Sequence, residues 1–300
     1  MKPKSRRFVA VDVLLLLLMI LPLVAGILLK ILTTPASEDI SITGALIYFT
    51  VPMPLQDLPV TEAQVNSLLV ILTVTGLCLY LTHGIRAGVQ TRRQLAAEWI
   101  VETVSGMVHE NMGNYFSGFA PFITSILALS GLSSLLSLLG LYAPTSDLNI
   151  VAGWAILVFI LITYYKCKCG PWYYIKSFGD PVAVLAPMNV ISEVATPFSM
   201  AFRHYGNILS GSIVSVLVAA ALQGLSSMLL GQLPGFLGEF PFLRIGIPAI
   251  LSIYFDVFSA CLQAYIFAVL TMLYVSSAFP QDEYEKRRLK KQQRKAQANS

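Results

Sequence analysis

Long apolar stretches, each about the length that crosses a membrane, dominate this sequence. A bilayer crossing needs about 20 mostly apolar residues. The stretches are Val9–Leu29, about Ser67–Thr82, about Phe116–Leu141, a fourth that ends near Tyr165, and two long blocks at His204–Gly238 and Ile245–Gln281. The chain is 56% hydrophobic and 12% charged, whereas soluble proteins are about 25% charged. We therefore expect an all-α polytopic membrane protein with about six membrane-embedded helices.

Lysine and arginine residues alternate between the loops that join these stretches. Counted from the N-terminus, the segments outside the stretches carry four, one, three, none, three, one and seven of them. Cytoplasmic loops carry the excess of positive charge. The alternation predicts six passes with both termini in the cytoplasm, and it explains the net charge of +4 without nucleic-acid binding.

The two ends of the chain lie outside the main set of spans. Residues 1–33 combine a basic start with the apolar stretch Val9–Leu29, which is also the pattern of a signal peptide. Lys30 follows directly, rather than a small-residue cleavage site, so we favour a retained helix. At the other end, residues 282–300 form a basic tail that we expect to be disordered.

The segment Gln94–His109 has a different pattern from the spans. Apolar residues recur at spacings of three and four, from Ala97 to Val108, and glutamates at 98 and 102 interrupt them. This pattern predicts an amphipathic helix that lies along the membrane surface.

The two long blocks exceed the thickness of a bilayer. As helices rising 1.5 Å per residue they would each be about 50 Å long, whereas the hydrocarbon core is about 30 Å thick. Long apolar helices tilt, kink or are covered by protein. We expect the two blocks to form a steeply tilted hairpin that is partly shielded by another protein. The alternative is that they form four ordinary spans joined by short linkers.

Arg203 stands near the start of the first long block, where a charge is costly. An arginine inside a span costs about 3 kcal/mol on insertion scales. It could reach the interface or pair with Glu193, although ten residues separate the two by about 15 Å along a helix. Asn207 and Ser210 share its helical face. Gly206 and Gly211 lack side chains, so another helix can approach closely.

The second long block carries a polar stripe. Asp256 and Gln263 are seven residues apart, and Ser259 lies between them on the same face. Polar stripes in apolar helices line water or a partner. A satisfied hydrogen bond between helices is the alternative explanation for Gln263.

These segments resemble the F-type ATP synthase subunit a family. The similar motifs are Pro197–Gly211, with Arg203 three residues before Gly206-Asn207; Leu262–Thr271; Pro144–Asn149; Glu110–Gly113; and Asn189–Glu193. The resemblance runs in order from about Leu46 to Ala278, and it implies a family domain over residues 34–281.

The resemblance implies a stator against which a ring of c subunits turns, with two aqueous half-channels meeting the ring on either side of Arg203. Asn207 and Gln263 match polar positions beside the arginine. Glu193 resembles an acid on the cytoplasmic access path, and Asp147 and Asn149 resemble residues at the opposite mouth. Peripheral-stalk b subunits, the lipid bilayer and a bacterial-type plasma membrane are the implied partners and location.

The sequence departs from the family pattern at several positions. Ser212 stands where an acid or histidine is frequent, and Asp256 stands where histidine or glutamate is frequent. We read this as one ionisable group moved to the other helix, which leaves open whether Asp256 alone relays protons. His204-Tyr205 replaces the usual apolar pair.

Other classes of function are less compatible with the sequence. It contains no phosphate-binding Gly-x-x-x-x-Gly-Lys-Ser/Thr loop and no His-Glu-x-x-His motif, so we expect a non-catalytic subunit. A secondary transporter of an anion held by Arg203 would show inverted repeats, which we do not see. Cys167 and Cys169 have no partner pair for zinc, and we expect no metal and no cofactor.

Overall fold

The structure is a computed structural model that describes residues 6–33, 44–54, 56–85, 91–179, 183–230, 250–251 and 253–298. Six helical segments in these ranges are long and apolar enough to cross a membrane, which confirms the all-α polytopic class. They are α1 (Arg6–Thr33), α2 (Glu62–Thr82), α4 (Ala120–Leu135) with the 3-10 turns η1 (Asn114–Phe119) and η2 (Leu136–Leu139), α5 (Leu148–Cys167), α7 (Ala186–Leu230), and the π-helical η5 (Ile253–Ser259) continued by α10 (Ala260–Ala278). The shorter elements are β1 (Ile47–Val51), β2 (Leu58–Thr61), α3 (Arg92–Met112), η3 (Pro144–Ser146), α6 (Pro171–Ser177), η4 (Ala183–Leu185) and α11 (Gln281–Ala298).

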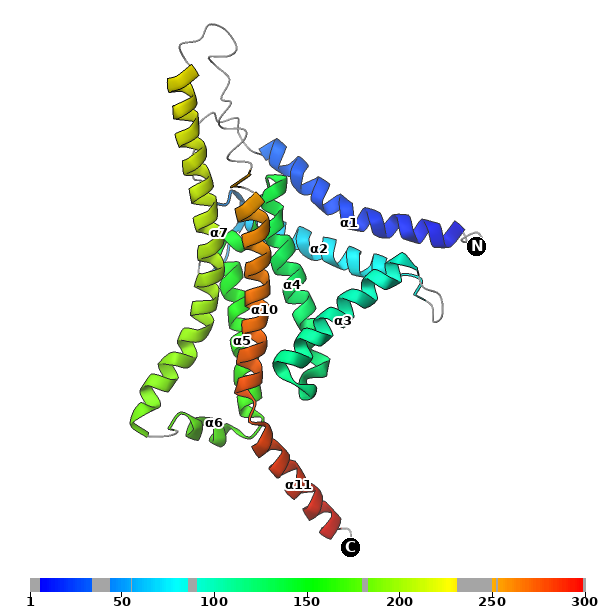
Figure 1. The fold of residues 1–300 in the computed structure, drawn as a ribbon, viewed down its shortest axis with the longest axis vertical. Helices are drawn as coiled ribbons and strands as arrows, with labels where there is room; N and C mark the ends of the chain where they lie inside the picture. The colour runs from blue at the N-terminus through cyan, green and yellow to red at the C-terminus, as the bar shows by residue number, and fades with distance from the viewer. Residues whose placement is uncertain are drawn as a thin grey trace.

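Helices α4, α5, α7 and α10 run alongside one another and form the body of the molecule (Figure 1). Their shared core contains Phe267 and Met272 of α10, Ile123 of α4, Val158 of α5 and Met200 of α7. Many large apolar side chains on the outer faces of these helices are exposed. Helices that are apolar all round suit a lipid environment, in which the backbone bonds are satisfied within the helix.

Helix α7 contains 45 residues, so it is about 68 Å long at 1.5 Å per residue. The N-terminal part of α7 is inclined to the rest of the helix (Figure 1). Pro197, which has no backbone N–H to donate to a helical hydrogen bond, lies inside α7. Residues 231–249, which contain the end of the first long block and the start of the second, lie outside the described residues. The steep tilt of the hairpin stays a prediction.

The expected amphipathic segment is helix α3, which is not among the six candidate spans of the described chain. Val104, Val108 and Met112 recur every fourth residue and are buried in the core cluster. Trp99, on the opposite face, is exposed. The 3.6-residue period of the pattern therefore positions one stripe against the bundle.

Helix α1 packs along α2 (Figure 1). Polar contacts fix α1 near both of its ends. Asp12 accepts two hydrogen bonds from Arg93 of α3, at 2.8 and 3.0 Å, and lies 2.9 Å from His83 Nδ1. At the other end Lys30 lies 3.4 Å from Glu62. Lys30 is eighteen positions after Asp12, about 27 Å along the helix, which is close to the thickness of a hydrocarbon core.

A glycine permits this close packing of α1. A side chain at Gly76 of α2 would place its Cβ 2.9 Å from the backbone nitrogen of Met19. Backbones approach this closely only where one residue has no side chain. Whether this helix is retained in the mature protein stays a prediction.

The structure differs from the sequence-based expectations at three places. The loop before α2 contains an antiparallel hairpin of β1 and β2, in which Thr50 pairs with Pro59. The first turns of the last span are π-helical. The basic tail, which we expected to be disordered, is helix α11, which projects from the end of the bundle (Figure 1).

Charge order within the helix and contacts with the rest of the protein explain the helix in the tail. Its acidic residues lie near the start and its basic residues follow, as the helix dipole favours. Arg287 pairs with Glu283 one turn earlier at 3.4 Å and donates a hydrogen bond to the Cys169 carbonyl. Tyr284 also packs against Phe279, with ring centroids 5.2 Å apart.

Candidate functional site

Arg203 lies on α7 with its side chain exposed. In the described ranges no carboxylate forms an ion pair with its guanidinium, and Glu193, the sequence-based candidate for that role, pairs instead with Lys166 at 2.8 Å. The backbone around Arg203 is regular helix. The arginine is therefore presented on the outside of an apolar helix without a counter-ion from the described chain.

Asn207, one turn after Arg203, contacts the last span. Its side-chain amide donates a 2.6 Å hydrogen bond to the hydroxyl of Ser259. Gly211, a further turn on, is buried, and an added Cβ would lie 3.1–3.4 Å from atoms of Phe255. Small residues thus bring the two helices together here. Ser210 is exposed and donates to the Asn207 carbonyl within α7.

The polar stripe expected on the last span is divided between two neighbours. Ser259 contacts α7, whereas half-buried Asp256 lies beside the Ser137 side chain of η2. Both residues belong to the π-helical segment, which has more residues per turn than an α-helix and so changes which positions share a face. Gln263, seven residues after Asp256, is 5% exposed on α10.

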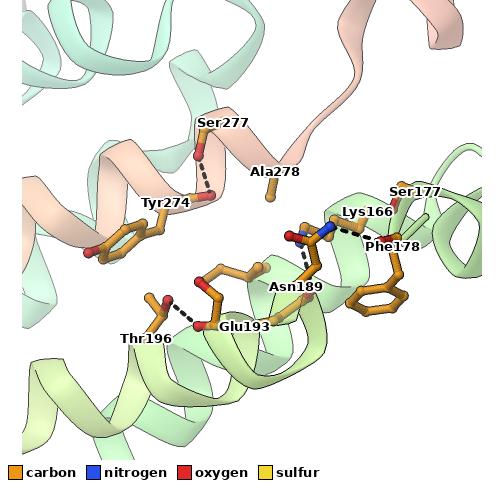
Figure 2. Close-up of a pocket in the computed structure, with 11 residues that line it drawn as sticks. Lys166, Ser177, Phe178, Asn189, Glu193, Thr196, Tyr274, Ser277 and Ala278 are labelled. Carbon is orange, nitrogen blue, oxygen red and sulfur yellow. Dashed lines mark hydrogen bonds and ion pairs between the residues drawn. The ribbon is translucent and has the colours of Figure 1, made fainter. Parts of the chain in front are cut away.

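Glu193 lines a pocket of about 370 Å³ at the end of the bundle opposite to Asp256. Figure 2 shows Asn189, Glu193 and Thr196 of α7 on one side and Tyr274, Ser277 and Ala278 of α10 on the other. Both carboxylate oxygens of Glu193 are engaged, one by Lys166 and the other by the Tyr174 hydroxyl at 3.0 Å. The pocket is therefore lined mainly by charged and polar groups.

Tyr174 of α6 remains a hydrogen-bond donor at physiological pH. Burial and the neighbouring Glu193 carboxylate raise the pKa of Tyr174 to about 12. A protonated phenol can donate to the carboxylate but cannot compete with it for a proton. Lys166 and Tyr174 thus hold the Glu193 carboxylate in position at one wall of the pocket.

Asp147 and Asn149 lie at the start of α5, at the end of the bundle away from this pocket. Asp147 is the N-cap of α5, and its carboxylate accepts a hydrogen bond from the Asn149 backbone N–H at 2.9 Å. Capping explains why an aspartate precedes this helix. The Asn149 side chain is exposed.

Sequence reasoning missed two groups of polar residues. Asp12 is an acid inside an apolar stretch, and its buried contact with Arg93 could have been suspected from that position alone. His204 is fully buried beside Ser130 of α4. The sequence has frequent serines in α4, from which neither a polar face nor a partner on α7 was predicted.

Comparison with known proteins identifies the family of this chain. The sequence profile of the family described as ATP synthase A chain matches residues 65–276. The chain belongs to the ATP synthase A chain family. ATP synthase subunit a of Acidothermus cellulolyticus is 31% identical over 213 residues, which are 68% of this chain and 72% of the relative. The Priestia megaterium subunit a is 32% identical over 196 residues, 62% of this chain and 78% of the relative.

As a member of the ATP synthase A chain family, the chain is a proton-translocating subunit of the membrane sector and not a catalytic subunit. The matched region extends from near the start of α2 to near the end of α10. Helix α1, the β1–β2 hairpin and helix α11 lie outside it. The contacts of Asp12 with α2 and α3 are therefore additions to the part of the chain that the family shares.

Proposed function

We propose that this subunit is the stator that faces a rotating ring of c subunits and carries protons to and from the ring carboxylates. The observation that carries the proposal is the exposed Arg203 on an apolar helix, with no carboxylate of the described chain paired to it. A membrane-buried carboxylate is neutral because its charge would be too costly there. A fixed cation is what would make it release its proton as it passes.

Arginine suits this role better than lysine. Its guanidinium does not lose a proton in proteins, whereas a buried lysine readily can. At about 4 Å and an effective dielectric of about 20, its attraction for a carboxylate is about 4 kcal/mol. This attraction shifts the ionisation equilibrium of the carboxylate by about a thousandfold. Such a shift is enough to favour ionisation without holding the c-ring in place.

Two polar regions on opposite sides of Arg203 support two half-channels. On the side we assign to the cytoplasm, Glu193 lines the pocket between α7 and α10. On the other side, Asp147, Asn149 and Asp256 provide polar groups between the end of the bundle and the level of Arg203. Asn207 and Gln263 complete the polar surroundings near the arginine.

The same proposal includes the surroundings of the subunit. Partners are the c-ring, which would cover the exposed face around Arg203, and peripheral-stalk b subunits. The steep tilt of α7 and of the last span would follow the ring surface. The location is a bacterial-type plasma membrane with both termini in the cytoplasm. No observation favours the alternative of an anion transporter.

Reconstitution of the purified membrane sector tests the function. We expect the subunit to co-purify with small hairpin proteins that each carry one mid-membrane carboxylate. Vesicles containing the complex should conduct protons down an imposed gradient in sodium-free buffer. Flux that requires sodium would change the assigned ion, and a complex without hairpin proteins would contradict the stator role.

Asp256 provides a prediction for the access path. Asn keeps the size of the side chain but cannot accept and release a proton, so Asp256→Asn should slow proton flux at least about tenfold. Ser212→Ala is the matched control, because Ser212 is exposed and bonds only to its own helix, at Leu209, in the described structure. Equal fluxes in the two variants would remove Asp256 from the path.

A further inference from the structure

The polar face of α4 continues inward from Asp256 and meets residues of three other elements. We call Ser130, Ser134, Ser137 and Thr145 the serine seam. The three serines recur at spacings of four and three, so they share one helical face. Ser137 lies beside Asp256, Ser134 lies 3.0 Å from the Thr145 hydroxyl, and Ser130 lies 3.4 Å from His204 Nε2.

Three of the four residues of the seam are buried in protein, and Ser137 is half-buried. Ser130 and Thr145 are 0% exposed and Ser134 is 2% exposed. Hydroxyl groups of this kind inside an apolar span are stabilised by hydrogen bonds, and Ser134 also bonds to the Ser130 carbonyl at 3.0 Å. The seam thus extends as a buried polar track from the end of the bundle that carries Asp147 to the level of α7 that carries Arg203.

His204 ends this track. Its ring is fully buried between Trp154 of α5 and Phe267 of α10, whose ring centroids lie 6.1 and 5.6 Å away. Its Nδ1 atom is buried and makes no hydrogen bond within the described structure. Burying a polar atom without a partner is costly, so packing alone would favour an apolar side chain at this position.

The position of His204 relative to Arg203 is set by the helix. Consecutive residues of an α-helix differ by about 100° in direction. Arg203 is exposed on the outer face of α7, and His204 is turned into the bundle towards the seam. The imidazole therefore lies at the same depth as the arginine but on the inner side of its helix.

We infer that His204 is a proton relay at the inner end of the half-channel that begins near Asp147 and Asp256, an inference that rests on the proposed function. Neutral imidazole has one N–H and one lone pair. A proton that reaches the imidazole binds the nitrogen that carries the lone pair, and the proton on the other nitrogen leaves towards a carboxylate of the c-ring. The imidazole of His204 ends neutral with its tautomer reversed, and charge is conserved.

Passive proton flux through the reconstituted membrane sector tests the relay. Gln keeps a polar side chain of similar reach but has no nitrogen that exchanges protons in this way. We expect His204→Gln and His204→Leu each to reduce flux at least about tenfold, with the c-ring still bound. Ser130→Ala should reduce flux in the same direction but less, because it removes one contact of the relay and leaves the imidazole.

Ser133→Ala is the matched control, because Ser133 is a buried serine of the same turn of α4 and makes no hydrogen bond to His204 in the described structure. It should conduct as the unchanged protein does. Wild-type flux in His204→Gln would overturn the relay, as would a loss in Ser133→Ala equal to that in Ser130→Ala. Arg203→Ala run in parallel separates the two hypotheses: normal pumping by that variant contradicts the stator role itself, whatever His204 does.

Discussion

Replacing Arg203 with alanine should abolish ATP-driven proton pumping while the complex still assembles. The variant removes an attraction of about 4 kcal/mol on each passing carboxylate, so the ionised state facing the stator becomes about a thousandfold rarer. Assembly should survive because the guanidinium makes no ion pair within the described chain and the core of α7 does not include it. Acidification of inverted vesicles on addition of ATP measures the pumping.

A charge-matched control separates the role of the guanidinium from the loss of a positive charge. Lys176→Ala removes one cation from the exposed face of α6 and should leave pumping unchanged. Arg203→Lys should pump poorly, because a desolvated lysine loses its proton more easily than arginine. Normal pumping by Arg203→Ala, with the c-ring bound, would refute the assigned role.

Replacing Asp12 with alanine should be the most destabilising single change outside the family-matched region. It leaves Arg93 without its two hydrogen bonds to the carboxylate and His83 without its partner. Breaking a buried ion pair costs about 3–5 kcal/mol. We expect the lower end, about 3 kcal/mol, because the Arg93 side chain is 27% exposed. The thermal midpoint of the detergent-solubilised complex should fall, and less subunit should accumulate in the membrane.

Glu102→Ala, an exposed acid of α3, is the control for this experiment and should leave both measurements unchanged. Mass spectrometry of the purified subunit completes the test, since a helix that is part of the fold should be retained in the mature protein. A mature chain that starts after residue 33, or an unaltered midpoint in Asp12→Ala, would contradict the structural role of α1.

Local patterns in the sequence predicted the helices and the charge that stands out among them. Apolar runs near 20 residues specify spanning helices because the bilayer requires satisfied backbone groups, and this requirement acts on each segment separately. Arg203 was recognised for the same reason, since its cost depends on its own position in the span. The period of the apolar residues likewise predicted α3.

Only the tertiary structure decided which polar residues meet. His204 and Ser130 are 74 residues apart, and Asp12 and Arg93 are 81 apart. Contacts at such separations depend on how the helices pack, which short-range periodicity does not report. The π-helical turns at Asp256 and the helix in the basic tail were missed for a related reason. Ring packing against Phe279 and a hydrogen bond to the Cys169 carbonyl stabilise α11. The π-helical geometry redirects side chains that a regular helix would align.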